Sequence, residues 1–159
     1  MLVRLYTDGA CSQNPGPGGW AVICCMPDET VELHDGKKDT TNNEMELTAI
    51  NKALWKVASM VSQGEASKSD AFEILSDSAY VVNAINGGWI QKWQRCNWLT
   101  SKGDPVKNRQ LWESVVVVMR QLKAMKVNVK FTKVRGHSNN AFNDRADQLA
   151  RSESVKYGQ

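Results

Sequence analysis

The sequence predicts an α/β protein built on a mixed β-sheet, and three observations support this. Short β-prone apolar segments alternate with longer segments whose apolar residues recur at helical spacing. The first three expected strands are separated only by short turns, which favours antiparallel pairing. The later strands follow helices, which favours parallel crossover connections. The expected order of elements is β-β-β-α-β-α-α-α-β-α.

The first part of the chain is expected to form three strands. Val3–Thr7 is apolar and β-prone, and Asp8-Gly9 is expected to end this strand. The segment SQNPGPGG that follows is a dense turn signal. Two more strands are expected at Gly19–Met26 and Glu29–Asp35.

The rest of the chain is expected to alternate between helices and strands. A helix is predicted from about Asn43 to Val61, where apolar residues are spaced three or four apart. A short strand at Phe72–Ser76 follows it. The remaining expected elements are a helix over Ser78–Ile85, a Trp-rich segment over Trp89–Trp98, a helix over Lys107–Met125, a strand over Val127–Val134 and a helix over Phe142–Glu153.

Composition narrows the class of protein. The chain has 159 residues, of which 42% are hydrophobic and 23% charged, typical of a single soluble globular domain. No apolar run approaches the ~20 residues that a membrane helix needs, so no membrane partner is expected. The net charge of +3 permits a polyanionic partner but is too small to predict one. The cysteines lack metal-finger spacing and indicate free thiols in the cytoplasm: Cys11, Cys24, Cys25 and Cys96.

Three carboxylates are expected where carboxylates are usually avoided. Asp8 and Asp77 each follow a predicted strand, at the sheet edge where ligands bind in α/β proteins. Glu46 falls within the apolar arc of its helix, whereas Glu44 falls on the opposite side. A single Asp after a strand more often forms a turn than binds a ligand. A single Glu at the position of Glu46 is as often a helix cap or a solvent-exposed group at the edge of the core as it is a functional residue.

Together, the three carboxylates predict a metal site. With no Lys or Arg fixed among them, converging carboxylates repel one another and raise their own pKa values. A bound divalent cation removes this repulsion. Oxygen-only ligands favour Mg²⁺ or Mn²⁺ over zinc.

The segment RGHSNNAFNDRAD, near the C-terminus, contains a histidine and two aspartates. At roughly 100° per residue, Asp144 lies about 175° from the mean direction of the apolar residues of the last helix, and Asp147 about 115°. Asp144 is therefore expected to point at water. Asp147 is expected at the border of the buried stripe, within reach of Asp8.

Four segments, YTDGACSQNPGPGGWAV, TTNNEMELTAI, ILSDSAYVVNAI and VRGHSNNAFNDRADQLA, resemble in order and local spacing the motifs of type 1 ribonuclease H. The resemblance spans nearly the whole chain. It implies a single ribonuclease H domain over residues 1–159, with a five-stranded mixed sheet flanked by helices. It also implies a metal-dependent endonuclease that hydrolyses the RNA strand of RNA–DNA hybrids, leaving 3′-hydroxyl and 5′-phosphate ends. The initial Met and the lack of a flanking domain favour a stand-alone, monomeric bacterial or phage-like form.

The resemblance also assigns the site residues. It implies two Mg²⁺ ions, with Mn²⁺ as a possible substitute, and a histidine that either shuttles a proton or helps release product. Asp8 is expected to bridge the ions. The implied catalytic residues are Asp8, Glu46, Asp77, His137 and Asp147, all but His137 being metal ligands.

Hybrid-binding residues are implied in two regions. Near the first helix, polar side chains are expected to contact 2′-hydroxyls and base edges, and Thr41 together with Asn108 is expected to bind a DNA phosphate, although Asn and Thr at helix starts also serve as caps. A basic protrusion, GGWIQKWQRCNWLTSKGDPVKN, is expected to contact the DNA strand, although its Trp side chains also suit a core. The implied substrate-binding residues are Asn14, Thr41, Asn42, Asn43, Trp89, Lys92, Trp93, Arg95 and Asn108.

Three other functions compete with this interpretation. A transposase, integrase or junction resolvase can share the fold, because fold alone does not specify function. The protrusion, the Asn residues and the His segment favour ribonuclease H over these. A domain of a reverse transcriptase is disfavoured by the intact protrusion. An inert hybrid-binding module would be expected to lack a metal ligand, and all four are present.

Overall fold

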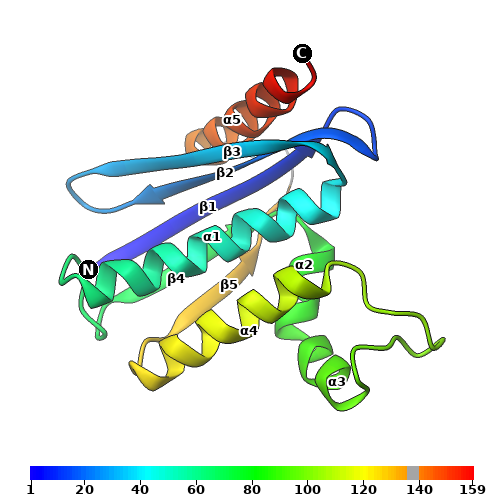
Figure 1. The fold of residues 1–159 in the computed structure, drawn as a ribbon. Helices are drawn as coiled ribbons and strands as arrows, with labels where there is room; N and C mark the ends of the chain where they lie inside the picture. Colours follow the sequence, from blue (N-terminus) through cyan, green and yellow to red (C-terminus); the bar gives the residue numbers. More distant parts are fainter. Residues whose placement is uncertain (136–139) are drawn as a thin grey trace.

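The structure is a computed structural model that describes residues 1–135 and 140–159, and these form a five-stranded mixed sheet with helices (Figure 1). The strand order across the sheet is β3-β2-β1-β4-β5. β2 is antiparallel to both β1 and β3, whereas β4 is parallel to β1 and β5. The predicted order of elements and the split between antiparallel and parallel strands are confirmed. The strands are β1 (Leu2–Cys11), β2 (Gly16–Cys25), β3 (Thr30–Thr40), β4 (Ala71–Ser76) and β5 (Val129–Lys133).

Helices cover the sheet on both faces. α1 and α4 pack against each other and share a core with one face, while α5 packs on the other face against β1, β2 and β3 (Figure 1). Because side chains alternate along a strand, Leu5 of β1 enters the first core and its neighbour Tyr6 enters the second. The helices are α1 (Asn42–Ser62), α2 (Ala79–Asn86), α3 (Trp89–Arg95), α4 (Arg109–Ala124) and α5 (Ala141–Tyr157).

The predicted end of the first strand was wrong. β1 does not stop at Asp8-Gly9 but continues to Cys11, because its antiparallel ladder with β2 extends as far as the pair Cys11–Gly18. β2 correspondingly begins at Gly16, so only four residues of the glycine- and proline-rich segment make the turn. Asp8 is therefore held inside a paired strand. This fixes its backbone more firmly than a turn would.

The parallel pairing of β1 with β4 sets the geometry of the functional site. The paired residues end at Tyr6 and Leu75. Two residues further along the chain are Asp8, still within β1, and Asp77, the residue after β4, so these two carboxylates stand level at the same edge of the sheet. The expectation that both acids meet at one sheet edge is thus explained by the register.

A glycine lets α1 approach this edge closely. A Cβ atom added at Gly9 would lie 2.4 Å from the backbone nitrogen of Glu46. Only a residue without a side chain permits this contact between β1 and the start of α1.

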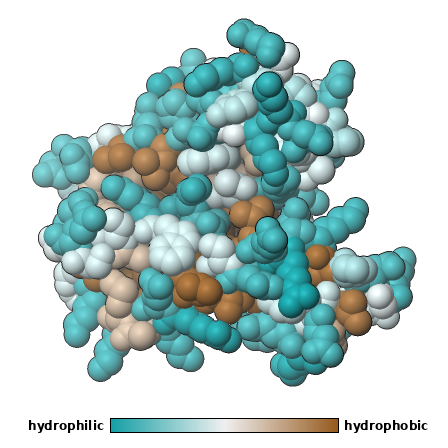
Figure 2. All heavy atoms as spheres, in the orientation of Figure 1, coloured by the Kyte–Doolittle hydropathy of each residue, from teal (hydrophilic) through white to brown (hydrophobic). Residues whose placement is uncertain are grey.

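The surface is that of an ordinary globular protein. On the face seen in Figure 2, apolar residues emerge in small groups among hydrophilic ones. Within the described residues, no helix combines the length and apolar character needed to cross a membrane. All four cysteines belong to the described part of the chain, and each is a free thiol, as predicted.

Candidate active site

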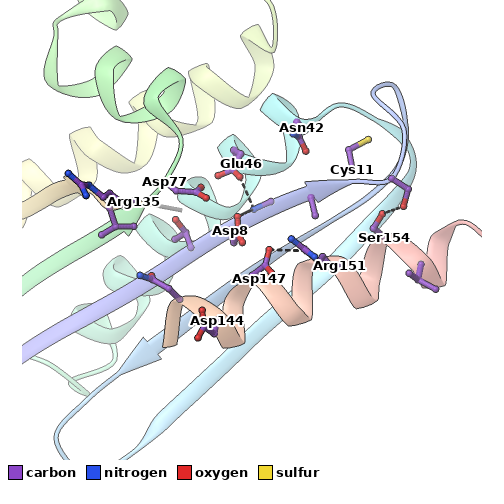
Figure 3. Close-up of a pocket in the computed structure, with 17 residues that line it drawn as sticks. Asp8, Cys11, Asn42, Glu46, Asp77, Arg135, Asp144, Asp147, Arg151 and Ser154 are labelled. Atoms are coloured by element: carbon purple, nitrogen blue, oxygen red, sulfur yellow. Dashed lines mark hydrogen bonds and ion pairs between the residues drawn. The ribbon is translucent and has the colours of Figure 1, made fainter. Parts of the chain in front are cut away.

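Three carboxylates from three elements converge at the edge of the sheet. Asp8 comes from β1, Glu46 from the second turn of α1, and Asp77 from the residue after β4. One carboxylate oxygen from each lies within 4.8 Å of the others. They line a cleft of about 560 Å³ that Asp147 of α5 also borders (Figure 3). The structure thus places all four predicted carboxylates around one cleft.

Glu46 is fixed by the start of α1. Thr41 caps this helix, and its hydroxyl accepts a hydrogen bond of 3.1 Å from the Glu44 amide. This sets the helical register that turns Glu46 inward, where only 9% of its surface is exposed. Its Oε1 accepts a hydrogen bond of 3.1 Å from the Gly9 amide. Its Oε2 is buried and has no hydrogen-bond partner within the described chain.

The cluster is electrostatically unfavourable without a cation. Burial, and then the charge of Asp77, raises the pKa of Asp8 from 3.8 to about 7. Burial, and then Asp8, raises the pKa of Glu46 well above its ordinary value. Both shifts express the cost of placing negative charges together away from water. A buried carboxylate oxygen without a partner, beside two more carboxylates, fits a divalent cation held by oxygen ligands.

Asp147 differs from the other three carboxylates. It lies on α5 facing Asp8, whose pKa its charge also raises, but it is not part of the tight three-residue cluster (Figure 3). Its Oδ1 accepts a hydrogen bond of 3.1 Å from Nε of Arg151, one turn later on the same helix. Both side chains are substantially exposed, so this pair contributes little stability. Asp147 therefore has a cation beside it, whereas the expectation that no cation is fixed among the carboxylates concerned Asp8, Glu46 and Asp77.

The predicted register of the last helix is confirmed. Ala146, Leu149 and Ala150 are buried against the sheet, Asp144 is exposed, and Asp147 lies between these extremes. Asp144 borders the same cleft, but in Figure 3 it lies on the side of α5 away from Asp8. α5 can lie close to β2 because a Cβ atom at Gly19 would be only 2.3 Å from the carbonyl oxygen of Ala150.

The cleft also contains cations that the sequence interpretation missed. Arg151 and Arg135 both line it, the latter on the Asp77 side (Figure 3). Arg151 follows Asp147 by four residues, a spacing that places two side chains on one helix face. This spacing was the feature of the sequence from which the pairing of Asp147 with Arg151 could have been predicted. His137 lies outside the described residues.

The polar residues proposed to contact a hybrid gather at the start of α1. The Oδ1 atom of Asn14, in the β1–β2 turn, accepts a hydrogen bond of 3.1 Å from the Asn42 amide. Asn42 also lines the cleft, and both Asn42 and Asn43 are exposed. Thr41 performs the capping role considered as the alternative. Thr41 is half-buried and lies next to the exposed residues Asn42 and Asn43 at the start of α1.

Asn108 occupies the cap position of α4 in a left-handed conformation, with φ of 62°. Asn tolerates this conformation better than most residues. In the part of the chain that the structure describes, its side chain makes no capping hydrogen bond to the helix. The side chain of Asn108 therefore does not serve as a helix cap, which was the alternative to phosphate binding.

The Trp-rich protrusion stands away from the sheet, with α3 and the loop after it at its end (Figure 1). The rings of Trp89 and Trp93 are 6.3 Å apart, which confirms that they share a helix face. Trp93 makes an edge contact with the buried Trp112 at 5.3 Å and so anchors the protrusion, while Trp89 remains 41% exposed. Trp98 is half-buried, with the Arg109 guanidinium 5.6 Å from its ring. The basic side chains are all exposed: Lys92, Arg95 and Lys102.

Comparison with known proteins places the chain in a family. The family model described as RNase H matches residues 2–155. A ribonuclease H of Chlorobium chlorochromatii is 44% identical, and the match covers 97% of this chain and 95% of the relative. A ribonuclease H of Caldicellulosiruptor saccharolyticus is 45% identical, with 94% of each chain covered.

Solved structures agree in fold. LC9-RNase H1, a type 1 RNase H, superposes with a TM-score of 0.76 at 26% identity, over 98% of this chain and 73% of that one. LC11-RNase H1, determined in complex with an RNA/DNA hybrid, superposes with a TM-score of 0.69 at 23% identity, over 97% of both chains.

Proposed function

The chain belongs to the ribonuclease H family, and from this premise we propose that it hydrolyses the RNA strand of RNA–DNA hybrids at the cleft of Asp8, Glu46, Asp77 and Asp147. The products would carry 3′-hydroxyl and 5′-phosphate ends. The observation that carries this proposal is the convergence of three buried or half-buried carboxylates, with oxygens within 4.8 Å, at the edge of a ribonuclease H sheet. Such an arrangement is costly in a protein unless it is used to bind cations.

The four carboxylates would hold the metal ions, with Asp8, whose pKa the other three all affect, central among them. The raised pKa values of Asp8 and Glu46, and the buried Oε2 of Glu46, support a cation at this position. An all-oxygen ligand set favours Mg²⁺, with Mn²⁺ as a substitute. When bound, such ions supply an activated water and stabilise the negative charge that develops on the phosphate.

The protein groups have separate tasks in the reaction. Gly9 orients Asp8 and Glu46, since its amide lies 2.9 Å from the Asp8 Oδ1 and 3.1 Å from the Glu46 Oε1. Hydrolysis breaks the bond between phosphorus and the 3′-oxygen, which must gain a proton. We propose His137, which follows Arg135 of the cleft by two residues, either as the group that moves this proton or as one that aids product release.

Recognition of the hybrid is proposed to involve two surfaces. Asn14, Asn42 and Asn43 are proposed to contact base edges and 2′-hydroxyls, the groups that distinguish RNA from DNA. The exposed start of α1 lies beside the catalytic cleft, which supports this assignment. Contact with the DNA strand is proposed for Thr41, Trp89, Lys92, Trp93, Arg95 and Asn108.

We further propose a single domain over residues 1–159 that acts as a monomer in the cytoplasm. The free cysteines support a reducing compartment. Recombinases and resolvases with a related fold are disfavoured by the ribonuclease H relatives of similar length.

Comparing substrates tests this function directly. The protein, with Mg²⁺, is incubated with a labelled RNA–DNA hybrid and separately with RNA–RNA and DNA–DNA duplexes of the same sequence. Cleavage of the RNA strand in the hybrid alone is expected. Comparable cleavage of the DNA–DNA duplex would support a recombinase-like nuclease instead.

A further inference from the structure

A second hollow opens from the active-site cleft onto the α5 side of the sheet. Its volume is about 540 Å³. Val134, Arg135 and Asn143 line both this hollow and the catalytic cleft, so the two are continuous. A chain bound at the carboxylates can therefore extend into the hollow without leaving the protein surface. The other residues that line it are Arg4, Tyr6, Glu73, Leu75 and Asn140.

The hollow is predominantly basic. Arg135 is exposed at the junction with the cleft. Arg4 pairs with Glu73 through a contact of 3.1 Å, and the pKa of Glu73 is lowered by a hydrogen bond from Thr132, by Arg4 and by the charge of Lys130. The lining thus holds two cations, Arg4 and Arg135, against one carboxylate, Glu73, and Lys130 lies near that carboxylate, which leaves an excess of positive charge suited to phosphate.

An aromatic pair lies beside the hollow, with Tyr6 in its lining and Phe142 stacked on Tyr6 next to the lining residues Asn140 and Asn143. The rings of Tyr6, in its lining, and Phe142, in the first turn of α5, stack with centroids 5.4 Å apart and an angle of 29°. Phe142 is 39% exposed, although it is among the largest apolar side chains of α5. The side chain of Asn140 caps this helix turn and so holds the Phe142 backbone in place.

We propose that this hollow binds unpaired ribonucleotides of the strand being cut, with a base stacked on Phe142. The proposal rests on the proposed function, because it takes the RNA strand to be the one at the carboxylates. Sites for single-stranded nucleic acid combine a basic groove with aromatic side chains on which bases stack. A base within a duplex is covered on both faces by its neighbours, so an exposed ring selects unpaired nucleotides. The occupant is therefore a single-stranded extension of the RNA.

Binding experiments in EDTA test this without requiring catalysis. Fluorescence anisotropy measures the affinity for three labelled hybrids: one blunt, one with a short single-stranded RNA extension, and one with a DNA extension of equal length. Each extension is tried at either end. The wild-type protein should bind one RNA-extended hybrid at least about fivefold more tightly than the blunt one, the lower range for stacking one base. The extension of the DNA strand should give no such gain in affinity, because the strand that runs from the carboxylates into the hollow is the RNA strand.

Variants of Phe142 identify the platform. Phe142→Ala should abolish the gain from the RNA extension, and Phe142→Tyr, which keeps an aromatic face, should retain it. Val117→Ala, which removes an exposed apolar side chain from α4, is the matched control and should behave as wild type. Equal affinity of the wild type for blunt and extended hybrids, or a gain that survives Phe142→Ala, would overturn the proposal. Failure to cleave the blunt hybrid would instead count against the proposed function.

Discussion

Replacing Asp8 by Asn should stabilise the metal-free protein at neutral pH. Folding raises the pKa of Asp8 from 3.8 to about 7, chiefly by burial and the charge of Asp77. The folded state therefore binds this proton more tightly than the unfolded state, and stability falls as pH rises between these two values. At 1.36 kcal/mol per pH unit, the loss from this carboxyl is on the order of 4 kcal/mol above pH 7 and close to zero below pH 4.

Urea unfolding in EDTA, followed by Trp fluorescence, measures this effect. At pH 8 the Asp8→Asn protein should have a higher free energy of unfolding than wild type, and the difference should shrink towards pH 4. Adding Mg²⁺ should stabilise the wild type and have less effect on the variant. Asp144→Asn, an exposed carboxylate on α5, is the control and should follow wild type. A wild-type protein that gains stability relative to Asp8→Asn as pH rises would refute the reasoning.

Three further predictions concern the cleft and the protrusion. Asp147→Asn should abolish or strongly reduce hybrid cleavage, because an amide is a poorer metal ligand, whereas Asp144→Asn should leave cleavage rates near wild type; the reverse result would mean that the assignment on α5 is wrong. Gly9→Ala should destabilise the protein by about 1–3 kcal/mol in urea unfolding and slow cleavage, because its methyl group would clash with the backbone of Glu46; unchanged stability would show that α1 can shift freely. Removing the exposed cations of the protrusion, with Lys92→Ala, Arg95→Ala and Lys102→Ala combined, should raise KM, weaken its salt dependence and change kcat little. A large loss of kcat at constant KM would instead place the segment in the catalytic machinery.

Much of the fold could be predicted because the local patterns agree with the final packing. The spacing of Ile50, Leu54 and Val57 marks the buried side of α1, and all three are fully buried. The end of β1 could not be predicted in the same way. Asp8-Gly9 resembles a turn locally, but pairing with β2 extends the strand, and that pairing depends on residues further along the chain.

The candidate site was predictable to the extent that it depends on element ends and helical register. Glu46 was placed by its position among apolar residues, and Asp8 and Asp77 by the strands before them. The ion pair of Asp147 with Arg151 needed side-chain geometry, although the spacing permitted it. The division of roles between Trp93, which contacts Trp112, and the exposed Trp89 needed the tertiary structure, because the two rings share one face of α3.

The dependence of RNA cleavage on divalent cations tests the central claim most directly. The wild-type protein is stripped of metal and mixed with an RNA–DNA hybrid labelled on the RNA strand, first in EDTA and then over a titration of Mg²⁺. The carboxylate cluster predicts no cleavage in EDTA and recovery as Mg²⁺ is added. Full cleavage of the RNA strand in excess chelator would contradict the account.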